Sequence, residues 1–196
     1  DTTDTTDTTD IPNAPYPPNP LNQRHFIYIG TTYPSHSHRP VARSLSRICI
    51  FSSVRGGHDP AFELAARQVA AEMSKRNISL LHGGGTFGYM GIIARAVQLG
   101  GGEVLGVIPS ALRSVSASGA VIGETKFVQT MDERKNILYP LADAFLVLPG
   151  GCGTLAELFE VLCEHQLGVH DVPVGLLNVN GVYDKLLEFI DHGIHV

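Results

Sequence analysis

The chain of 196 residues carries a formal net charge of −5, with 43% hydrophobic and 17% charged residues. This composition indicates one globular domain with a sizeable core. Four of the negative charges are Asp1, Asp4, Asp7 and Asp10, so the remainder is almost neutral and gives nucleic-acid binding no electrostatic support. We therefore expect no nucleic-acid partner. We also expect no membrane partner, because no apolar run approaches the length of a membrane span.

The three cysteines, Cys49, Cys152 and Cys163, include no Cys-x-x-Cys pair and do not indicate a disulfide framework. A reducing compartment is the simpler assumption for such a chain. No apolar signal-peptide core stands near its start. We therefore expect a cytoplasmic protein.

Residues 1–46 are expected to form a low-complexity leader. A Thr/Asp repeat and a proline-rich stretch make residues 1–25 disordered or extended in this prediction. The segment Phe26–Ile29 is compatible with a short strand. His36 and His38 have the spacing of a metal-binding pair. A metal site needs three or four ligands, so we expect a solvated loop and no metal.

Residues 47–196 are expected to form a single domain that alternates strands with helices. Asp59 before Pro60 marks the start of the first helix, as N-cap and first helical residue. Apolar runs predict strands at residues 48–51, 78–81, 104–109, 126–129, 144–148 and 173–179. The alternation predicts an α/β fold with a doubly wound, mainly parallel, Rossmann-like sheet, whose ligands bind beyond the carboxyl ends of the strands.

Two glycine-rich loops follow predicted strands at those carboxyl ends. Glycines let backbone N–H groups approach a ligand, and the start of a helix adds positive dipole, so both loops are candidate phosphate cradles. The first loop lacks the Gly-Lys-Ser/Thr of a Walker loop and fits the dinucleotide fingerprint poorly. The candidate residues are Gly83, Gly84 and Gly85 in the first loop, and Gly150, Gly151, Gly153 and Thr154 in the second.

Glu157 follows Thr154 by three residues and has two interpretations. As part of a site, its carboxylate lies within reach of whatever the second loop holds. As part of a capping box, Thr154 is the N-cap and Glu157 reaches back to the Thr154 N–H. The two interpretations compete for the Glu157 side chain.

Arg134 and Lys135 stand early in another predicted helix, which a second capping box opens at Thr130 and Glu133. Two adjacent cations near a helix start oppose the helix dipole. The pair therefore has two interpretations, a functional pair with an anionic partner or a solvated basic pair.

Several segments form motifs whose order and spacing resemble those of one known family. They are GGGTFGYMG at 83–91, GVIP at 106–109, MDERK at 131–135, PGGCGTLAE at 149–157, QLGVH at 166–170 and NVNGVY at 178–183. Together they resemble the lonely-guy family of cytokinin-activating enzymes, once described as lysine decarboxylases. The resemblance covers about residues 47–196.

The resemblance implies a cytokinin riboside 5′-monophosphate phosphoribohydrolase, usually a homodimer that needs no metal or other cofactor. Such an enzyme hydrolyses the N-glycosidic bond of an N6-modified AMP, and in many members of AMP itself, to the free base and ribose 5-phosphate. The family's catalytic Arg and Glu map onto Arg134 and Glu157. Its substrate-binding residues map onto the two glycine loops, Thr154 and Lys135.

Two departures from the family pattern stand near the expected site. Asp132 occupies the His position of the family's MHxRK, and Ser52 to Arg55 replace its CGSS segment. The family also usually continues past the last helix, so we expect this chain to lack a terminal strand and helix.

Two other functions remain as alternatives. The departures favour a non-catalytic carrier of a nucleotide or cofactor on the same fold. Cys152, at a helix start where thiol pKa values fall, could act as a nucleophile with His82 or His165, although an inert small residue is the simpler interpretation. Lysine decarboxylation has no support, because no lysine stands in a context typical of a pyridoxal Schiff base.

Overall fold

The computed structural model describes residues 26–28, 44–57, 59–112 and 121–193. The Thr/Asp repeat, the proline-rich stretch, His36 and His38 lie outside these ranges. The predictions of disorder and of a solvated loop therefore concern residues that the structure does not describe.

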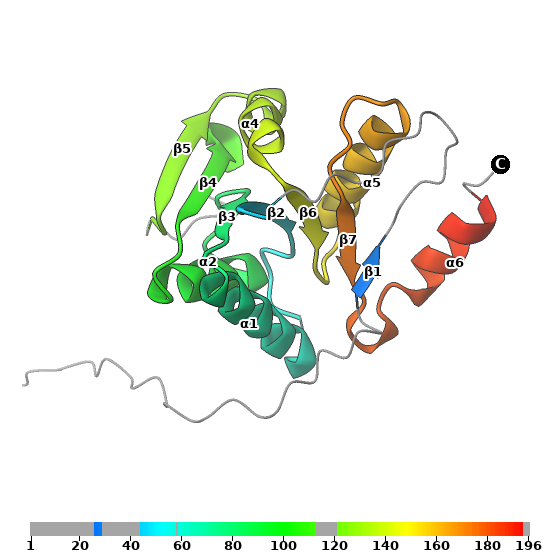
Figure 1. The fold of residues 1–196 in the computed structure, drawn as a ribbon, viewed down its shortest axis with the longest axis horizontal. Helices are drawn as coiled ribbons and strands as arrows, with labels where there is room; N and C mark the ends of the chain where they lie inside the picture. Colours follow the sequence, from blue (N-terminus) through cyan, green and yellow to red (C-terminus); the bar gives the residue numbers. More distant parts are fainter. Residues whose placement is uncertain (1–25, 29–43, 58, 113–120, 194–196) are drawn as a thin grey trace, which may run out of the picture.

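The described residues form one seven-stranded sheet with the order β1-β7-β6-β2-β3-β4-β5. Strands β2 to β7 run parallel, and β1 pairs antiparallel with β7 at the edge, with Phe26 opposite Leu177. The strands are β1 (Phe26–Tyr28), β2 (Arg47–Phe51), β3 (Ser79–His82), β4 (Val104–Pro109), β5 (Glu124–Val128), β6 (Ala144–Val147) and β7 (Val174–Leu177). The doubly wound, mainly parallel sheet predicted from the sequence is confirmed (Figure 1).

Local sequence signals explain where several helices begin and end. The Asp59 carboxylate accepts a hydrogen bond from the Ala61 N–H at 2.9 Å, as its predicted N-cap role requires, and Asn77 turns to φ 54° just after the helix. Thr130 likewise accepts from the Glu133 N–H at 3.1 Å. The helices are α1 (Pro60–Lys75), α2 (Gly88–Leu99), α4 (Met131–Leu138), α5 (Cys152–Gln166) and α6 (Asp184–Gly193), with 3₁₀ turns η2 (Ser110–Leu112), η3 (Tyr139–Leu141) and η4 (Val179–Gly181).

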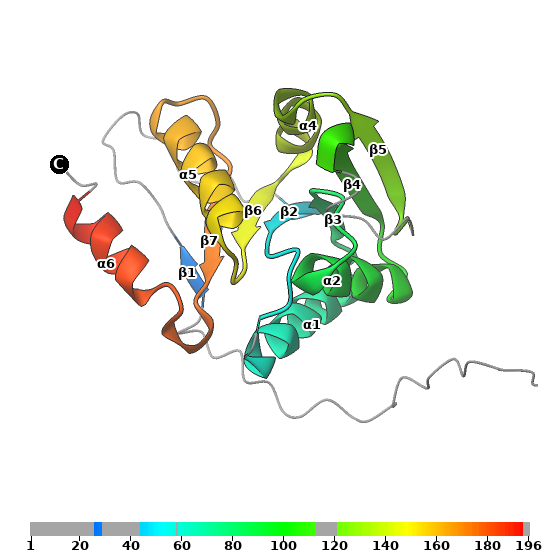
Figure 2. The same ribbon diagram turned by 180° about the vertical axis from the view of Figure 1, so that it is seen from behind.

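The sheet buries side chains on both faces, because successive residues of a strand point to opposite sides. Ile50 and Leu80 belong to the core beneath α1 and α2. Cys49 and Leu81, their neighbours in sequence, belong to the core beneath α4 and α5. Figures 1 and 2 show α1 and α2 side by side, and α5 against β6 and β7. Continuous apolar strands are therefore explained by burial on two faces.

The strand order reverses direction between β2 and β6. From β2 the chain adds β3, β4 and β5 on one side, and then returns to place β6 and β7 on the other. In an open α/β sheet such a switch point leaves a crevice beyond the carboxyl ends of the two strands. The loops after β2 and β6 border this crevice, and the loop after β3 lies beside it.

Candidate active site

The loop after β6 leads directly into α5 and is fixed by a buried hydrogen bond. The Tyr183 hydroxyl donates to the Leu148 carbonyl at 2.7 Å. Thr154 is buried, and a Cβ on Gly150 would overlap its hydroxyl, so only glycine fits at that position. A Cβ on Gly151 or Gly153 would instead meet no atom within 4 Å. The first N–H groups of this 15-residue helix have no partner within the helix, and space is open beside Gly151 and Gly153, as an anion site requires.

The N-cap of helix α5 lies three residues earlier than the capping-box interpretation requires. Its N-cap is Gly151 and its first residue is Cys152, so Thr154 is already the third helical residue. The capping-box interpretation of Thr154 and Glu157 is therefore wrong. Glycine and cysteine carry no capping side chain, which is why the earlier start left no clear signal in the sequence.

Glu157 forms an ion pair with Arg134, and this pair is the centre of the candidate site. The guanidinium Nη2 of Arg134 donates to Oε1 of Glu157. The two side chains are only 12% and 16% exposed. Burial raises the pKa of the Glu157 carboxyl above its ordinary value, and Arg134 opposes this rise. A buried carboxylate with a perturbed pKa, held beside a guanidinium, is an arrangement typical of groups that take part in proton transfer.

The loop after β3 supplies the floor beneath Arg134. A Cβ on Gly83 would overlap the Arg134 guanidinium, so the absence of a side chain there creates the space that the guanidinium occupies. Gly84 has φ +75°, and a Cβ on it would lie 2.8 Å from the Ile108 Cβ. Gly85 is buried. The first glycine loop therefore contributes backbone to the same site as the second loop.

Lys135 points away from this ion pair, toward the next turn of α5. Its amine donates to Glu160 Oε1 at 2.5 Å and lies 3.0 Å from Asp132. These hydrogen bonds, first to Glu160 and then to Asp132, raise the pKa of Lys135 and keep it protonated. The Tyr139 hydroxyl donates to the other oxygen of Glu160 at 3.0 Å. A contact of Lys135 with substrate stays a prediction.

Sequence reasoning overlooked Glu160 and Tyr139. Glu160 lies three residues after Glu157, and side chains at this spacing share one face of a helix. That spacing was the available signal for Glu160. Nothing in the sequence connected Glu160 with Lys135 or Tyr139, because these contacts join residues more than 20 positions apart. Asp132 turns out to be an exposed partner of Lys135.

The Ser52–Arg55 segment packs on the start of α2. Ser53 Oγ accepts from the Arg55 N–H at 3.0 Å, and the Ser53 carbonyl accepts from the Met90 N–H at 3.2 Å. Gly88, with φ +55°, lies directly against the Val54 and Arg55 backbone, where a Cβ would overlap it. This unusual segment is therefore accommodated by backbone packing beside the crevice.

The geometry does not assemble a cysteine nucleophile. Cys152 is exposed at the start of α5. His165 follows it by 13 residues on the same helix, a separation of about 20 Å at 1.5 Å per residue. His82 is buried, and neither of its ring nitrogens has a partner among the described residues. Burial, and then the nearby Arg134 charge, lowers the pKa of His82 to about 4, so its ring is neutral at neutral pH.

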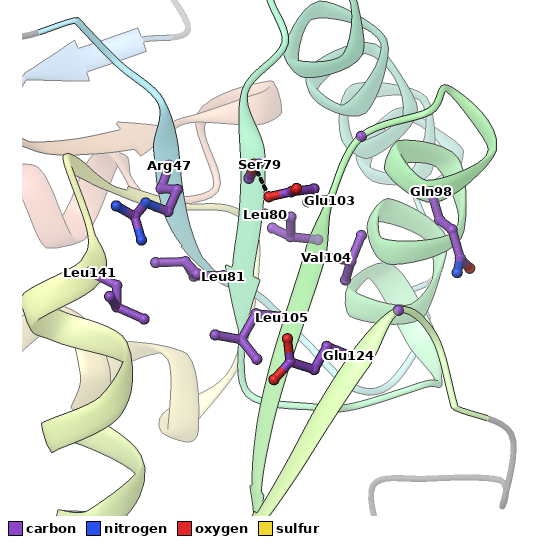
Figure 3. Close-up of a pocket in the computed structure, with 12 residues that line it drawn as sticks. Arg47, Ser79, Leu80, Leu81, Gln98, Glu103, Val104, Leu105, Glu124 and Leu141 are labelled. Carbon is purple, nitrogen blue, oxygen red and sulfur yellow. Dashed lines mark hydrogen bonds between the residues drawn. The ribbon is translucent and has the colours of Figure 1, made fainter.

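A separate hollow lies at the opposite end of the sheet, where the strands begin (Figure 3). It has a volume of about 460 Å³, and Arg47, Ser79, Glu103 and Glu124 are among its lining residues. None of the predicted site residues lines it. Within the described part of the chain, no helix is both long and apolar enough to cross a bilayer, and no three His, Cys, Asp or Glu side chains are grouped as metal ligands.

Comparisons with known proteins agree with these motifs. The family model described as "Possible lysine decarboxylase" matches residues 90–196. The probable cytokinin riboside 5′-monophosphate phosphoribohydrolase LOG4 of Oryza sativa subsp. japonica is 47% identical over 147 residues, which are 75% of this chain and 64% of its own. Cytokinin riboside 5′-monophosphate phosphoribohydrolase LOG7 of Arabidopsis thaliana is 49% identical over 148 residues, 76% of this chain and 68% of its own. This chain belongs to the lonely-guy (LOG) family.

The same comparisons give the share of the relatives that this chain covers and a solved structure that shares its fold. The chain spans about two thirds of the length of the curated relatives it matches. The Moco carrier protein from Chlamydomonas reinhardtii superposes with a TM-score of 0.57 at 19% identity, covering 76% of this chain and 85% of the carrier. At that identity the likeness shows a shared fold.

No lysine of this chain supports the lysine decarboxylase activity in the description of the family model. Decarboxylation through pyridoxal needs an uncharged lysine amine that can form a Schiff base. All four lysines of the chain instead form ion pairs, each with its amine within 4.0 Å of a carboxylate oxygen. They are Lys75, Lys126, Lys135 and Lys185.

Proposed function

We propose that this chain hydrolyses the N-glycosidic bond of cytokinin riboside 5′-monophosphates, releasing the free base and ribose 5-phosphate. AMP is a second substrate in this proposal. The observation that carries it is the buried Arg134–Glu157 ion pair beside the open start of α5. Relatives at 47–50% identity that are named as phosphoribohydrolases support the same reaction.

The chemistry needs an anion cradle and a carboxylate at a defined separation. Glu157 follows Cys152 by five residues, about 7.5 Å along the helix. A 5′-phosphate bound at Gly151, Gly153 and Thr154 therefore leaves room for the ribose between the helix start and the carboxylate. The phosphate would be stabilised by the N–H groups and dipole of the helix start.

In the proposed reaction, water attacks C1′ of the ribose while the bond from C1′ to the base nitrogen breaks. Glu157, as a carboxylate, accepts a proton from the water and stabilises the positive charge that develops on the sugar. The base leaves with the electron pair of the broken bond and takes up a proton. Arg134 keeps Glu157 in position and offers donors to substrate oxygen atoms.

The experiment is a product assay with isopentenyladenosine 5′-monophosphate and, separately, AMP, in which chromatography measures free base and ribose 5-phosphate. We expect Glu157→Gln to reduce base release by about 100-fold or more. The matched control is Glu188→Gln, which makes the same change at an exposed carboxylate on α6. Full activity in Glu157→Gln, or no base release from folded wild-type protein, would overturn the proposal.

The carrier alternative makes a different prediction in the same assay. A carrier binds the nucleotide tightly and returns it unhydrolysed after long incubation. The likeness to the Moco carrier protein is one of fold and does not favour this function. The buried acid and guanidinium at the switch point favour hydrolysis, because a carrier needs no buried carboxylate beside a bound anion.

We also infer a homodimer in the cytoplasm. Leu167 and Val169, just after α5, are exposed apolar side chains of the kind that subunit interfaces bury. All three cysteines are free, as expected in a reducing compartment. Light scattering coupled to size exclusion tests the dimer, and a monomer at micromolar concentration would contradict it.

A further inference from the structure

Helix α5 carries three carboxylates on the face that meets α4. Glu157, Glu160 and Glu164 follow one another at spacings of three and four residues, which places them in one row. Glu157 contacts Arg134, and Glu160 contacts Lys135, the next residue of α4. Two consecutive cations of one helix thus each bind a carboxylate of the other helix.

Glu160 is the most heavily bonded member of this row. Lys135 donates to one of its oxygens at 2.5 Å, and the Tyr139 hydroxyl donates to the other at 3.0 Å. The Lys135 and Glu160 side chains are partly buried, so the pair is screened less than a surface pair. Lys135 lies in α4, and Tyr139 directly follows that helix. Their common acceptor, Glu160, therefore holds this end of α4 against α5 beside the site.

We propose that Glu160, held by Lys135 and Tyr139, is a positioning residue that acts electrostatically on the Glu157 carboxylate one helical turn away. The inference rests on the hydrolysis proposed above for its catalytic consequence, but not for its electrostatic one. In this inference Lys135 acts on Glu157 indirectly, by compensating the negative charge of Glu160.

Charge at Glu157 depends on which groups face it. The negative charge of Glu160 adds to burial in favouring the protonated form of Glu157, and Arg134 opposes both. Lys135 compensates the Glu160 charge, so its loss would favour protonated Glu157. Three other titratable groups lie around the Arg134–Glu157 pair, and burial keeps each of them neutral at neutral pH. They are Cys49 of β2, Tyr139 of η3 and His82 of β3.

The two partners of the pair therefore make opposite predictions. Glu160→Gln keeps an acceptor for Lys135 and Tyr139 but removes the negative charge, so the pKa of Glu157 falls. Lys135→Met removes the compensating cation, so the pKa of Glu157 rises. For Glu160→Gln, Coulomb's law in water, at the roughly 6 Å spacing of side chains one helical turn apart, gives a fall of about half a pH unit in the pKa of Glu157. The double variant Lys135→Met/Glu160→Gln removes both charges and should return the pKa close to the wild-type value.

The experiment follows the side-chain carboxyl of Glu157 by ¹³C NMR during a pH titration of the whole protein, with the signal assigned through Glu157→Gln. It needs no turnover, so its outcome is separate from the test of hydrolysis. Where base release is measurable, the acidic limb of the rate against pH should move in parallel. The matched control, Lys185→Met on α6, removes a cation from an exposed pair and should leave the titration unchanged.

Opposite shifts that cancel in the double variant support the inference. Equal shifts in both single variants, or no shift in either, would overturn it. A merely structural role of the pair predicts losses of stability that add in the double variant, with the Glu157 titration unmoved. A fully active wild type with unmoved titrations would overturn this inference and leave the hydrolysis proposal intact.

Discussion

Replacing Arg134 with methionine leaves a buried carboxylate without its cation, and the cost should depend on pH. Both side chains of the pair are less than one fifth exposed. An unpaired buried charge costs about 3–5 kcal/mol if it stays ionised. Glu157 can avoid that cost by taking up a proton. Because burial already raises its folded-state pKa, this ionisation opposes folding as pH rises above the ordinary value for glutamate.

Proton uptake sets the upper limit of this cost. At 1.36 kcal/mol per unit, protonating a carboxyl of ordinary pKa about 4.3 costs about 3.7 kcal/mol at pH 7 and about 1 kcal/mol at pH 5. Arg134→Met should therefore lose up to about 2.7 kcal/mol more unfolding free energy at pH 7 than at pH 5, relative to wild type. Below about pH 4 the carboxyl is protonated in both folded and unfolded chains, and this part of the loss disappears.

Urea unfolding followed by circular dichroism at the two pH values measures the difference. Arg76→Met is the matched control, because Arg76 makes an exposed pair with Glu72 and should cost less than about 1 kcal/mol at either pH. Arg134→Met/Glu157→Gln should lose the pH dependence. An equal loss at pH 5 and pH 7 in Arg134→Met would refute the reasoning, since it would mean that packing alone carries the effect.

Three further substitutions separate the function of the site from the stability of the fold. Gly83→Ala places a methyl group against the Arg134 guanidinium and should reduce turnover by about 100-fold. The unfolding free energy should change little, because the flexible Arg134 side chain can move aside. Gly175→Ala, whose added carbon would make ordinary contacts at 3.5 Å, is its control and should keep full turnover. Gly153→Ala should stabilise α5 by up to about 1 kcal/mol in urea unfolding and raise KM, because its methyl group enters the open space expected for phosphate. Tyr183→Phe should lower the unfolding free energy by about 1–3 kcal/mol, since the buried carbonyl of the loop after β6 loses its donor; a loss well below this range would mean that water replaces the hydroxyl.

The sequence determined the secondary structure and the layer order of this protein closely. Apolar runs alternating with helical patterns predicted the parallel sheet, and the capping residues Asp59 and Thr130 marked two helix starts. These signals are local, because a cap or an apolar period acts within one or two turns. The start of α5 was missed because its N-cap, Gly151, has no side chain and so leaves no such local signal.

The sequence also determined which residue types the site would hold, because separate short motifs supply the glycines, the cations and the acid. Tertiary structure alone decided how they meet. The side chains of Arg134 and Glu157 are 23 residues apart in the chain and come together because β6 returns to the side of β2. The partnership of Lys135 with Glu160 arises in the same way, from two helices packed on one face of the sheet. Contacts of this kind depend on strand order and helix packing, which are set by the burial of the whole core and by no single segment of the sequence.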